Sequence, residues 1–240
     1  LLRPNKVLTD YYILKNTPEC KGGKLSFKIR ELSEDISWFQ KFEMICVEAA
    51  KEYRIGYDPE GKLLSYIRPQ LPNEIVDNIG NSLFGKMAKK NMDDSREYFK
   101  SKPKDKVYLN FGKIETNFAK LILVDPQVCG GVYCEGYNCP PIKLSIYIYI
   151  FINSVYYLIG VLHTRAEFYP DIIDLTPYLP QIKGDLKICL QFTAEHKVSF
   201  IGLDTTPPIP LKTRVYPLVQ AVHTELGEVT DILREDNDKF

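Results

Sequence analysis

The chain has 240 residues, and its 31 Lys and Arg balance 31 Asp and Glu, so the formal net charge is zero. Proteins that bind nucleic acid usually need a basic surface, so this balance disfavours nucleic acid as a partner. Hydrophobic residues make up 45% of the chain and charged residues 26%, which excludes disorder for the bulk and allows one large domain or two small ones. With 16 Tyr and 12 Phe against 3 Met, the composition favours strands over helices.

The first seventy residues have the pattern of a β meander. Hydrophobic and polar residues alternate over 25–30, which predicts a half-buried strand. The sequence Asp58-Pro-Glu-Gly61 predicts a turn. Further strand-like runs lie at 7–14, 39–47, 53–57 and 63–67. We therefore predict an N-terminal β unit over residues 1–70.

A small helical insertion is expected next. Apolar residues between positions 75 and 79 have helical spacing, and Gly80 is suited to end a helix. A second helical turn is expected after Asp93, and residues 85–104 are polar and rich in Lys. Residues 71–105 are therefore predicted to connect two β units.

An uncharged stretch over residues 144–162 is long enough for a transmembrane helix. Its residues are mostly Ile, Val, Tyr and Phe, which favour sheets, and Asn153-Ser154 at its centre favours a turn. We therefore predict an antiparallel hairpin of two strands, 144–152 and 155–162, buried on both faces. No membrane-spanning segment is expected.

The rest of the second half is also predicted to be β. The expected strands lie at 107–111, 121–124, 165–178, 186–192 and 198–203. Consecutive strands at this spacing predict a jelly-roll-like β-sandwich over 106–210, followed by a C-terminal connector over 211–240. The predicted fold class is mainly β, with two β-sandwich or jelly-roll-like units and a small helical insertion.

One part of this region resembles a known type of module. It contains Tyr169-Pro-Asp-Ile-Ile-Asp-Leu-Thr-Pro-Tyr-Leu179, then Gly184-Asp-Leu-Lys-Ile-Cys-Leu-Gln-Phe192 and the strand-like segment that ends at Thr205. The pattern resembles galactose-binding-like jelly-roll modules of uncharacterised prokaryotic secreted and cell-surface proteins, mainly over 107–205. The resemblance implies a secreted or cell-surface location and carries over no catalytic residues.

Three cysteines lie five residues apart in a Gly- and Pro-flanked loop, Cys129, Cys134 and Cys139. Cys20, in another turn, is the fourth loop cysteine. A structural zinc site usually has closer pairs and four ligands, so disulfides are favoured over free thiols and over a metal site. The two remaining cysteines lie in strand-like runs and are expected to be buried hydrophobes, Cys46 and Cys189.

The histidines give little support to catalysis. His163 and His196 are expected at the surface or at strand ends, and Ser199 and Asp204 lie near His196 without the pattern of a catalytic triad. No nucleotide-binding glycine motif occurs, so no cofactor is expected.

Three carboxylates lie within eight residues, Glu167, Asp171 and Asp174. Such oxygen ligands suit calcium, although the spacing is not that of an EF-hand. The alternative is a solvated end of the sandwich with turn-capping aspartates.

These observations favour a non-catalytic structural or adhesive module, secreted or on a cell surface, that assembles with copies of itself or other surface proteins through exposed strand edges. The alternative is a carbohydrate-binding module in which Tyr133, Tyr137 and Trp38 stack on sugar rings. An enzyme of unrecognised type is the third hypothesis.

Overall fold

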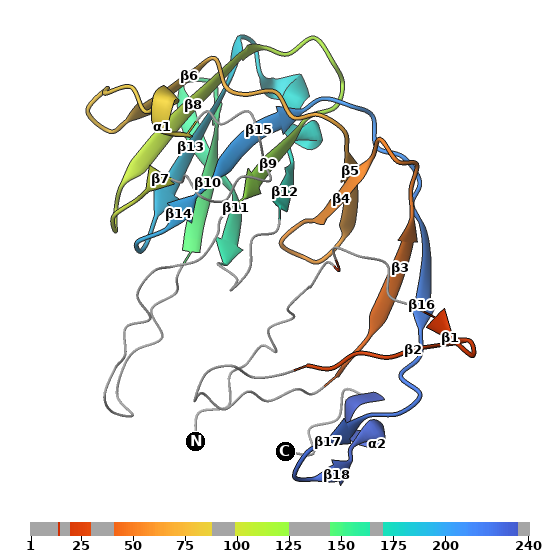
Figure 1. Cartoon of the computed structure of the whole chain (residues 1–240). Helices are drawn as coiled ribbons and strands as arrows, with labels where there is room; N and C mark the ends of the chain where they lie inside the picture. Colours follow the sequence, from red (N-terminus) through yellow and green to blue (C-terminus); the bar gives the residue numbers. More distant parts are fainter. Residues whose placement is uncertain are drawn as a thin grey trace, which may run out of the picture. The chain divides into compact units, whose positions relative to one another are not determined.

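The computed structural model describes residues 14, 20–29, 41–87, 99–124, 145–163 and 170–234, and it confirms a mainly β fold (Figure 1). The first strands are β1 (Cys20–Lys21), β2 (Lys24–Leu25), β3 (Met44–Glu48), β4 (Arg54–Tyr57), β5 (Leu63–Tyr66), β6 (Glu74–Asp77), β7 (Phe99–Lys100), β8 (Lys106–Lys113) and β9 (Lys120–Val124). They are followed by β10 (Ser145–Ile152), β11 (Val155–His163), β12 (Pro170–Asp174), β13 (Asp185–Phe192), β14 (Lys197–Val198), β15 (Phe200–Asp204), β16 (Lys212–Tyr216), β17 (Val222–His223) and β18 (Gly227–Glu228). The helical segments are α1 (Phe84–Met87), the 3₁₀ helix η1 (Thr176–Gln181) and α2 (Thr230–Arg234).

The chain divides into two compact units. Unit 1 comprises Leu1–Ile13 and Lys51–Ile209, and unit 2 comprises Leu14–Ala50 and Pro210–Phe240. The boundaries predicted from the sequence lie at residues 70, 105 and 210. Residues 51–105 belong to unit 1 because β4, β5 and β6 join sheets whose other strands come from later in the chain.

Unit 1 contains two five-stranded sheets, and we call the first the front sheet and the second the back sheet. The front sheet has the order β11-β10-β13-β8-β6 and is antiparallel throughout. The back sheet has the order β15-β9-β12-β4-β5, and its β12–β4 pair is parallel. Short strands β7 and β14 pair with each other.

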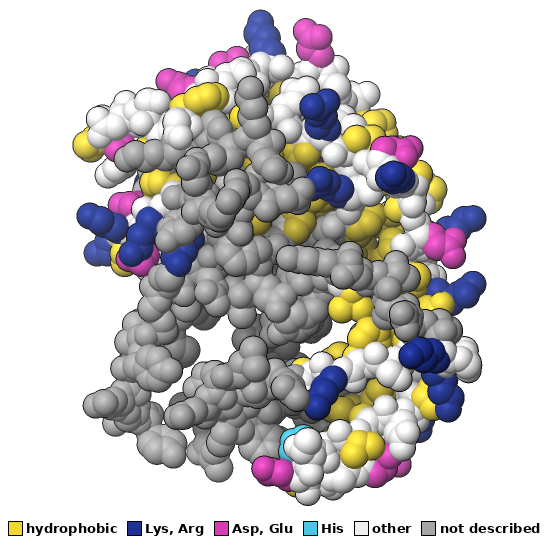
Figure 2. Space-filling view, in the orientation of Figure 1, with side chains coloured by type: hydrophobic (Ala, Val, Ile, Leu, Met, Phe, Trp, Pro, Cys, Tyr) yellow, Lys and Arg dark blue, Asp and Glu magenta, His cyan; other side chains and the backbone are white. Residues whose placement is uncertain are grey.

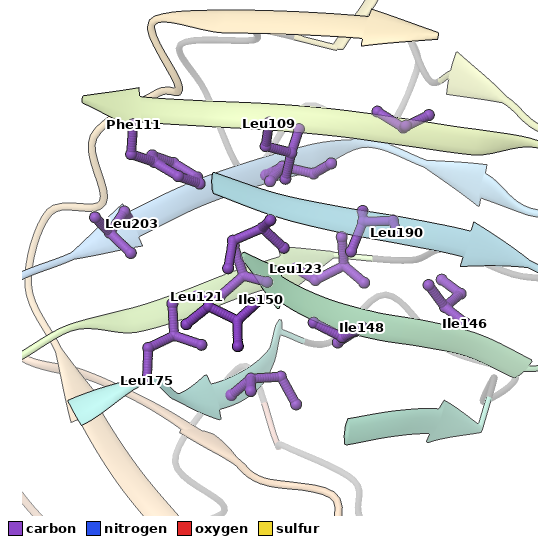
Figure 3. Packing of buried hydrophobic residues seen from close by; sticks show 14 of the residues in the cluster. Leu109, Phe111, Leu121, Leu123, Ile146, Ile148, Ile150, Leu175, Leu190 and Leu203 are labelled. Carbon is purple, nitrogen blue, oxygen red and sulfur yellow. The ribbon is translucent and has the colours of Figure 1, made fainter. Parts of the chain in front are cut away.

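The main core lies between these two sheets. In β10 the isoleucines alternate with aromatic residues, so Ile146, Ile148 and Ile150 are completely buried. They meet Leu190 of β13 and Leu121 of β9, together with the other apolar side chains labelled in Figure 3. The period-two pattern of the sequence therefore selects the side of each strand that faces the core.

The back sheet is buried on both faces, which the sequence analysis did not anticipate. Leu121 and Leu123 of β9 face the main core, whereas Ile122 and Val124 belong to a second, smaller cluster. That cluster also contains Leu64, Tyr66, Ile172 and Phe200. The outer face of β9 is therefore covered by side chains of β5.

The predicted hairpin at the centre of the chain is confirmed. Strands β10 and β11 pair antiparallel through Ile152 and Val155, and Asn153 and Ser154 both have positive φ, as a two-residue hairpin turn requires. No helix in the described part of the chain is long and apolar enough to cross a membrane. The expectation that both faces are buried is wrong for β11. This strand lies at the edge of the front sheet, and the side chain of Tyr157 is about half exposed.

The helix predicted from the spacing of residues 75–79 is wrong. Residues Glu74–Asp77 form β6, which pairs with β8 and buries Ile75 completely. Gly80, expected to end a helix, has a φ of +85° in a tight turn closed by Asp77, whose Oδ1 accepts hydrogen bonds from the N–H groups of Ile79 and Asn81. Three apolar residues are too few to separate helical from strand periodicity.

Unit 2 is built of short elements. Strands β3 and β16 pair antiparallel, β1 pairs with β2, and β17 pairs with β18 ahead of α2. The predicted connector over 211–240 thus contains strands and a helix. The predicted strand at 25–30 is wrong, because β2 ends at Leu25 and the side chains of Phe27 and Ile29 are exposed.

Neighbouring side chains leave no room for a Cβ at Gly202 in unit 1. Gly202→Ala is therefore expected to lower the free energy of unfolding by about 1–3 kcal/mol. A Cβ at this position would lie 2.7 Å from Cβ of Pro69 and 2.8 Å from the ring of Phe200. Urea unfolding followed by circular dichroism measures the change. The control is Gly184→Ala, where an added Cβ meets nothing within 4 Å. Equal stability of the two variants would contradict the predicted crowding.

Candidate functional site

The outer face of the front sheet, opposite the core, carries a row of side chains from all five strands. One residue from each strand belongs to this row, and each is the register partner of the next. In the strand order β6, β8, β13, β10 and β11, they are Val76, Tyr108, Cys189, Tyr149 and Leu158. Direct partners in antiparallel strands have their side chains on the same face. We call this row, together with Tyr147, Phe151, Tyr156, Lys187 and Gln191 of the neighbouring rows, the aromatic face.

The rings of the aromatic face pack against one another. Tyr156 lies 5.0 Å from Phe151 and 5.7 Å from Tyr108, measured between ring centroids. Nζ of Lys187 lies 5.8 Å from the centroid of Phe151, within reach of a cation–π interaction. The five aromatic side chains are half-buried.

Burial shifts the titration of two groups in this face. It raises the pKa of the Cys189 thiol to about 11, although the charge of Lys106 and a hydrogen bond with Tyr108 act in the opposite direction. Burial, together with the neighbouring Cys189 and Tyr108, raises the pKa of Tyr156 to about 12. Cys189 and Tyr156 therefore add no charge to the aromatic face at neutral pH.

The two described cysteine side chains are expected to differ in reactivity. Cys46 is exposed, which corrects the expectation that it is buried, whereas Cys189 is buried as predicted. Because the thiolate is the nucleophile, iodoacetamide at pH 8 should modify Cys46 rapidly and Cys189 slowly, as peptide mapping would show. The raised pKa of Cys189 favours the folded state below pH 9, and this contribution is lost between pH 9 and about 11. Equal labelling rates in the native protein would contradict the burial of Cys189.

A buried ion pair lies on the other side of unit 1. Nζ of Lys120, on β9, is 2.8 Å from Oδ2 of Asp204, on β15, and the two side chains are 4% and 0% exposed. Lys120 also donates a hydrogen bond to the carbonyl oxygen of Ser65. Asp204 accepts hydrogen bonds from the backbone N–H of Ile67 at 3.3 Å and from Oγ1 of Thr206 at 2.6 Å.

The pairing of β9 with its neighbours and the segment that follows β5 explain why the ion pair is buried. Asp204 on β15 and Asp174 on β12 are both direct partners of Lys120, so the three charged residues form one row across adjacent strands. The segment that follows β5 lies over this row, where Gln70 and Leu203 exchange two backbone hydrogen bonds of 2.8 Å. The pair is thereby shielded from water.

Most of the predicted site residues lie outside the described residues. These are the proposed sugar-stacking residues Trp38, Tyr133 and Tyr137, the loop cysteines Cys129, Cys134 and Cys139, and the calcium candidate Glu167. Cys20 begins β1, but its side chain also lies outside the description.

The other two calcium candidates do not come together. Asp171 and Asp174 are three residues apart on β12, so their side chains point to opposite faces of the strand. Asp171 is buried and Asp174 is exposed, with its Oδ1 accepting a hydrogen bond from the N–H of Thr176. Within the described residues, no group of three or more His, Cys, Asp or Glu could hold a metal ion.

His196 is completely buried, which corrects the expectation that it lies at the surface. Its ring centroid is 5.5 Å from that of Phe192, and its backbone exchanges hydrogen bonds with Ser101. Ser199 donates its hydroxyl to the carbonyl of Val124, and Asp204 pairs with Lys120. The three residues considered for a triad therefore have different partners. His163 lies on β11, and its side chain is outside the description.

Neither the aromatic face nor the ion pair between Lys120 and Asp204 was predicted from the sequence. The aromatic face had a signal, since Tyr147, Tyr149 and Phe151 alternate along one predicted strand. The ion pair had none, because nothing local connects Lys120 with a residue 84 positions later in the chain.

The charges on the visible surface are mixed. On the face shown in Figure 2, Lys and Arg side chains are interspersed with Asp and Glu, without one extended basic area among the described residues. Neither a family model nor a curated protein sequence matches this chain.

Proposed function

We propose that the protein is a non-catalytic structural or adhesive module, secreted or displayed on a cell surface, that assembles with copies of itself through the edge of β11. The observation that carries this proposal is the exposure of an uncharged edge strand. Among the described strands, β11 ends the front sheet, and Val155, Tyr157 and Leu158 are each about half exposed. The secreted or surface location rests on the resemblance of residues 107–205 to surface modules.

Edge strands present unpaired N–H and C=O groups that can pair with another strand. Proteins usually protect long edges with charges, prolines or bulges. Residues 155–162 contain no charged residue and no proline. One bulge lies on this strand at Ile159, because Ile148 and Tyr149 pair with Gly160 and Leu158. Two β11 strands related by a twofold axis would pair antiparallel and join two front sheets into one.

The test compares assembly of the unmodified chain with that of Leu158→Lys. We expect light scattering after size exclusion to show concentration-dependent association that Leu158→Lys abolishes, because a charge on the edge opposes strand pairing. Val222→Lys, at an exposed position of unit 2, is the matched control and should leave association unchanged. A monomeric unmodified chain at all concentrations would contradict the proposal.

Carbohydrate binding is the second candidate, and the aromatic face favours it. Aromatic rings beside Lys187 and Gln191 combine stacking surfaces with hydrogen-bond donors, as binding sites for polar ligands with apolar faces require. The loop residues first considered, Trp38, Tyr133 and Tyr137, remain part of this candidate. A glycan array tests it: binding should fall for Tyr149→Ala and persist for Phe84→Ala, at an exposed site elsewhere. Silence of the unmodified chain would contradict it.

A further inference from the structure

The ion pair between Lys120 and Asp204 holds a primary amine against a carboxyl group in a site shielded from water. Nζ and Oδ2 are 2.8 Å apart, and the side chains are almost completely buried. Condensation of the two groups needs an amine and a carboxylic acid, which differ from the ion pair by the transfer of one proton from Nζ to Oδ2 across 2.8 Å. Two reactants held in this way react as one molecule, which removes much of the entropic barrier to bond formation.

We propose that Lys120 and Asp204 condense into an intramolecular isopeptide bond that joins β9 to β15. Nζ of Lys120 attacks Cγ of Asp204, the C–N bond forms and the bond between Cγ and Oδ2 breaks. The ammonium group carries three protons before the reaction. Two leave with Oδ2 as water and one remains on the amide nitrogen. The product is neutral, and the reaction consumes no oxidant, reductant or cofactor.

The polar groups around the pair match the product. A secondary amide has one N–H, and the carbonyl oxygen of Ser65 already accepts a hydrogen bond from Nζ. The oxygen that stays, Oδ1, accepts from the N–H of Ile67 at 3.3 Å. The oxygen that leaves, Oδ2, accepts from Oγ1 of Thr206 at 2.6 Å, a contact that helps the oxygen to depart as water.

The register of the sheet fixes the two reacting residues. Lys120 begins β9 and Asp204 ends β15, and the two are direct partners in an antiparallel pair. Asp174 is the partner of Lys120 on the other side, and its side chain is exposed. The bond would link segments 84 residues apart in sequence.

Mass spectrometry of the whole chain tests the proposal directly. We expect the denatured, reduced and alkylated protein to be lighter by one water molecule than the mass calculated for the sequence with all six cysteines alkylated. Reduction and alkylation remove any mass difference due to the cysteines. After proteolysis, tandem mass spectrometry should identify a branched peptide that joins the fragment with Lys120 to the fragment with Asp204. The loss should disappear in Lys120→Arg, which keeps the charge but cannot condense, and persist in Lys106→Arg.

The unmodified chain decides the outcome even if Lys120→Arg fails to fold. An intact mass equal to that calculated for the fully alkylated sequence would overturn the proposal, and so would a water loss that maps to other residues. The proposal does not depend on self-assembly, because the bond forms inside one chain. A monomer that contains the bond would support the bond and contradict self-assembly. An oligomer that lacks the bond would support self-assembly and contradict the bond.

Discussion

Replacement of Lys120 by Met is expected to lower the free energy of unfolding by about 3–5 kcal/mol, because it leaves the carboxylate of Asp204 buried without its positive partner. The side chain of Asp204 is completely buried, so water cannot take the place of the ammonium group. The carbonyl oxygen of Ser65 loses its donor from Nζ as well. Urea unfolding followed by circular dichroism measures the effect, and a covalent bond between the two residues would add to it.

Two further variants separate the charge from the loss of packing. Lys62→Met removes an exposed lysine of the same unit and should change stability by less than about 0.5 kcal/mol. Adding Asp204→Asn to Lys120→Met removes the buried charge while keeping an acceptor for the N–H of Ile67, so the double variant should be more stable than Lys120→Met alone. A double variant that is less stable would contradict the assignment of the loss to the uncompensated charge.

Truncation of Phe192 to Ala is expected to lower the free energy of unfolding by about 3–5 kcal/mol, because it opens a cavity at the end of the main core. Phe192 is completely buried and packs against the rings of Phe99 and His196, with centroid distances of 6.2 and 5.5 Å. Its backbone N–H also donates to the carbonyl of Asp105 and should keep that hydrogen bond. The midpoint of urea unfolding reports the change.

Phe84→Ala is the matched control, since this ring is exposed in the same unit. We expect its effect to be less than about 1 kcal/mol. Similar destabilisation by both substitutions would show that Phe192 does not pack in the core as described. Hydrogen exchange of β13 and β14 would then locate the difference.

The sequence predicted strands well where a period of two continued over many residues. Strands β8, β10 and β13 were found in this way, and so was the hairpin turn at Asn153 and Ser154. The prediction failed where the pattern was short, as in β6. It also failed for the burial of β11, and it gave no prediction for the burial of β9, because burial depends on the position of a strand in its sheet, which alternation along the strand does not reveal.

The candidate sites show the same division. The alternating aromatics of β10 were visible in the sequence, but their union with Tyr108 and Cys189 depends on pairing between strands distant in the chain. The partnership of Lys120 with Asp204 arises only from the register of β9 with β15. Long-range pairing of this kind leaves no local signature.

The contacts that β5 and the segment after it make with β9 and β15 affect the order in which unit 1 can form. Ser65 and Ile67 are synthesised before their polar partners, Lys120 and Asp204. Contacts so distant in sequence form slowly, because a long loop must close before they are gained. Residues 65–67 therefore cannot make these contacts until residue 204 has been synthesised. This face of unit 1 can therefore form only after β15 has been synthesised.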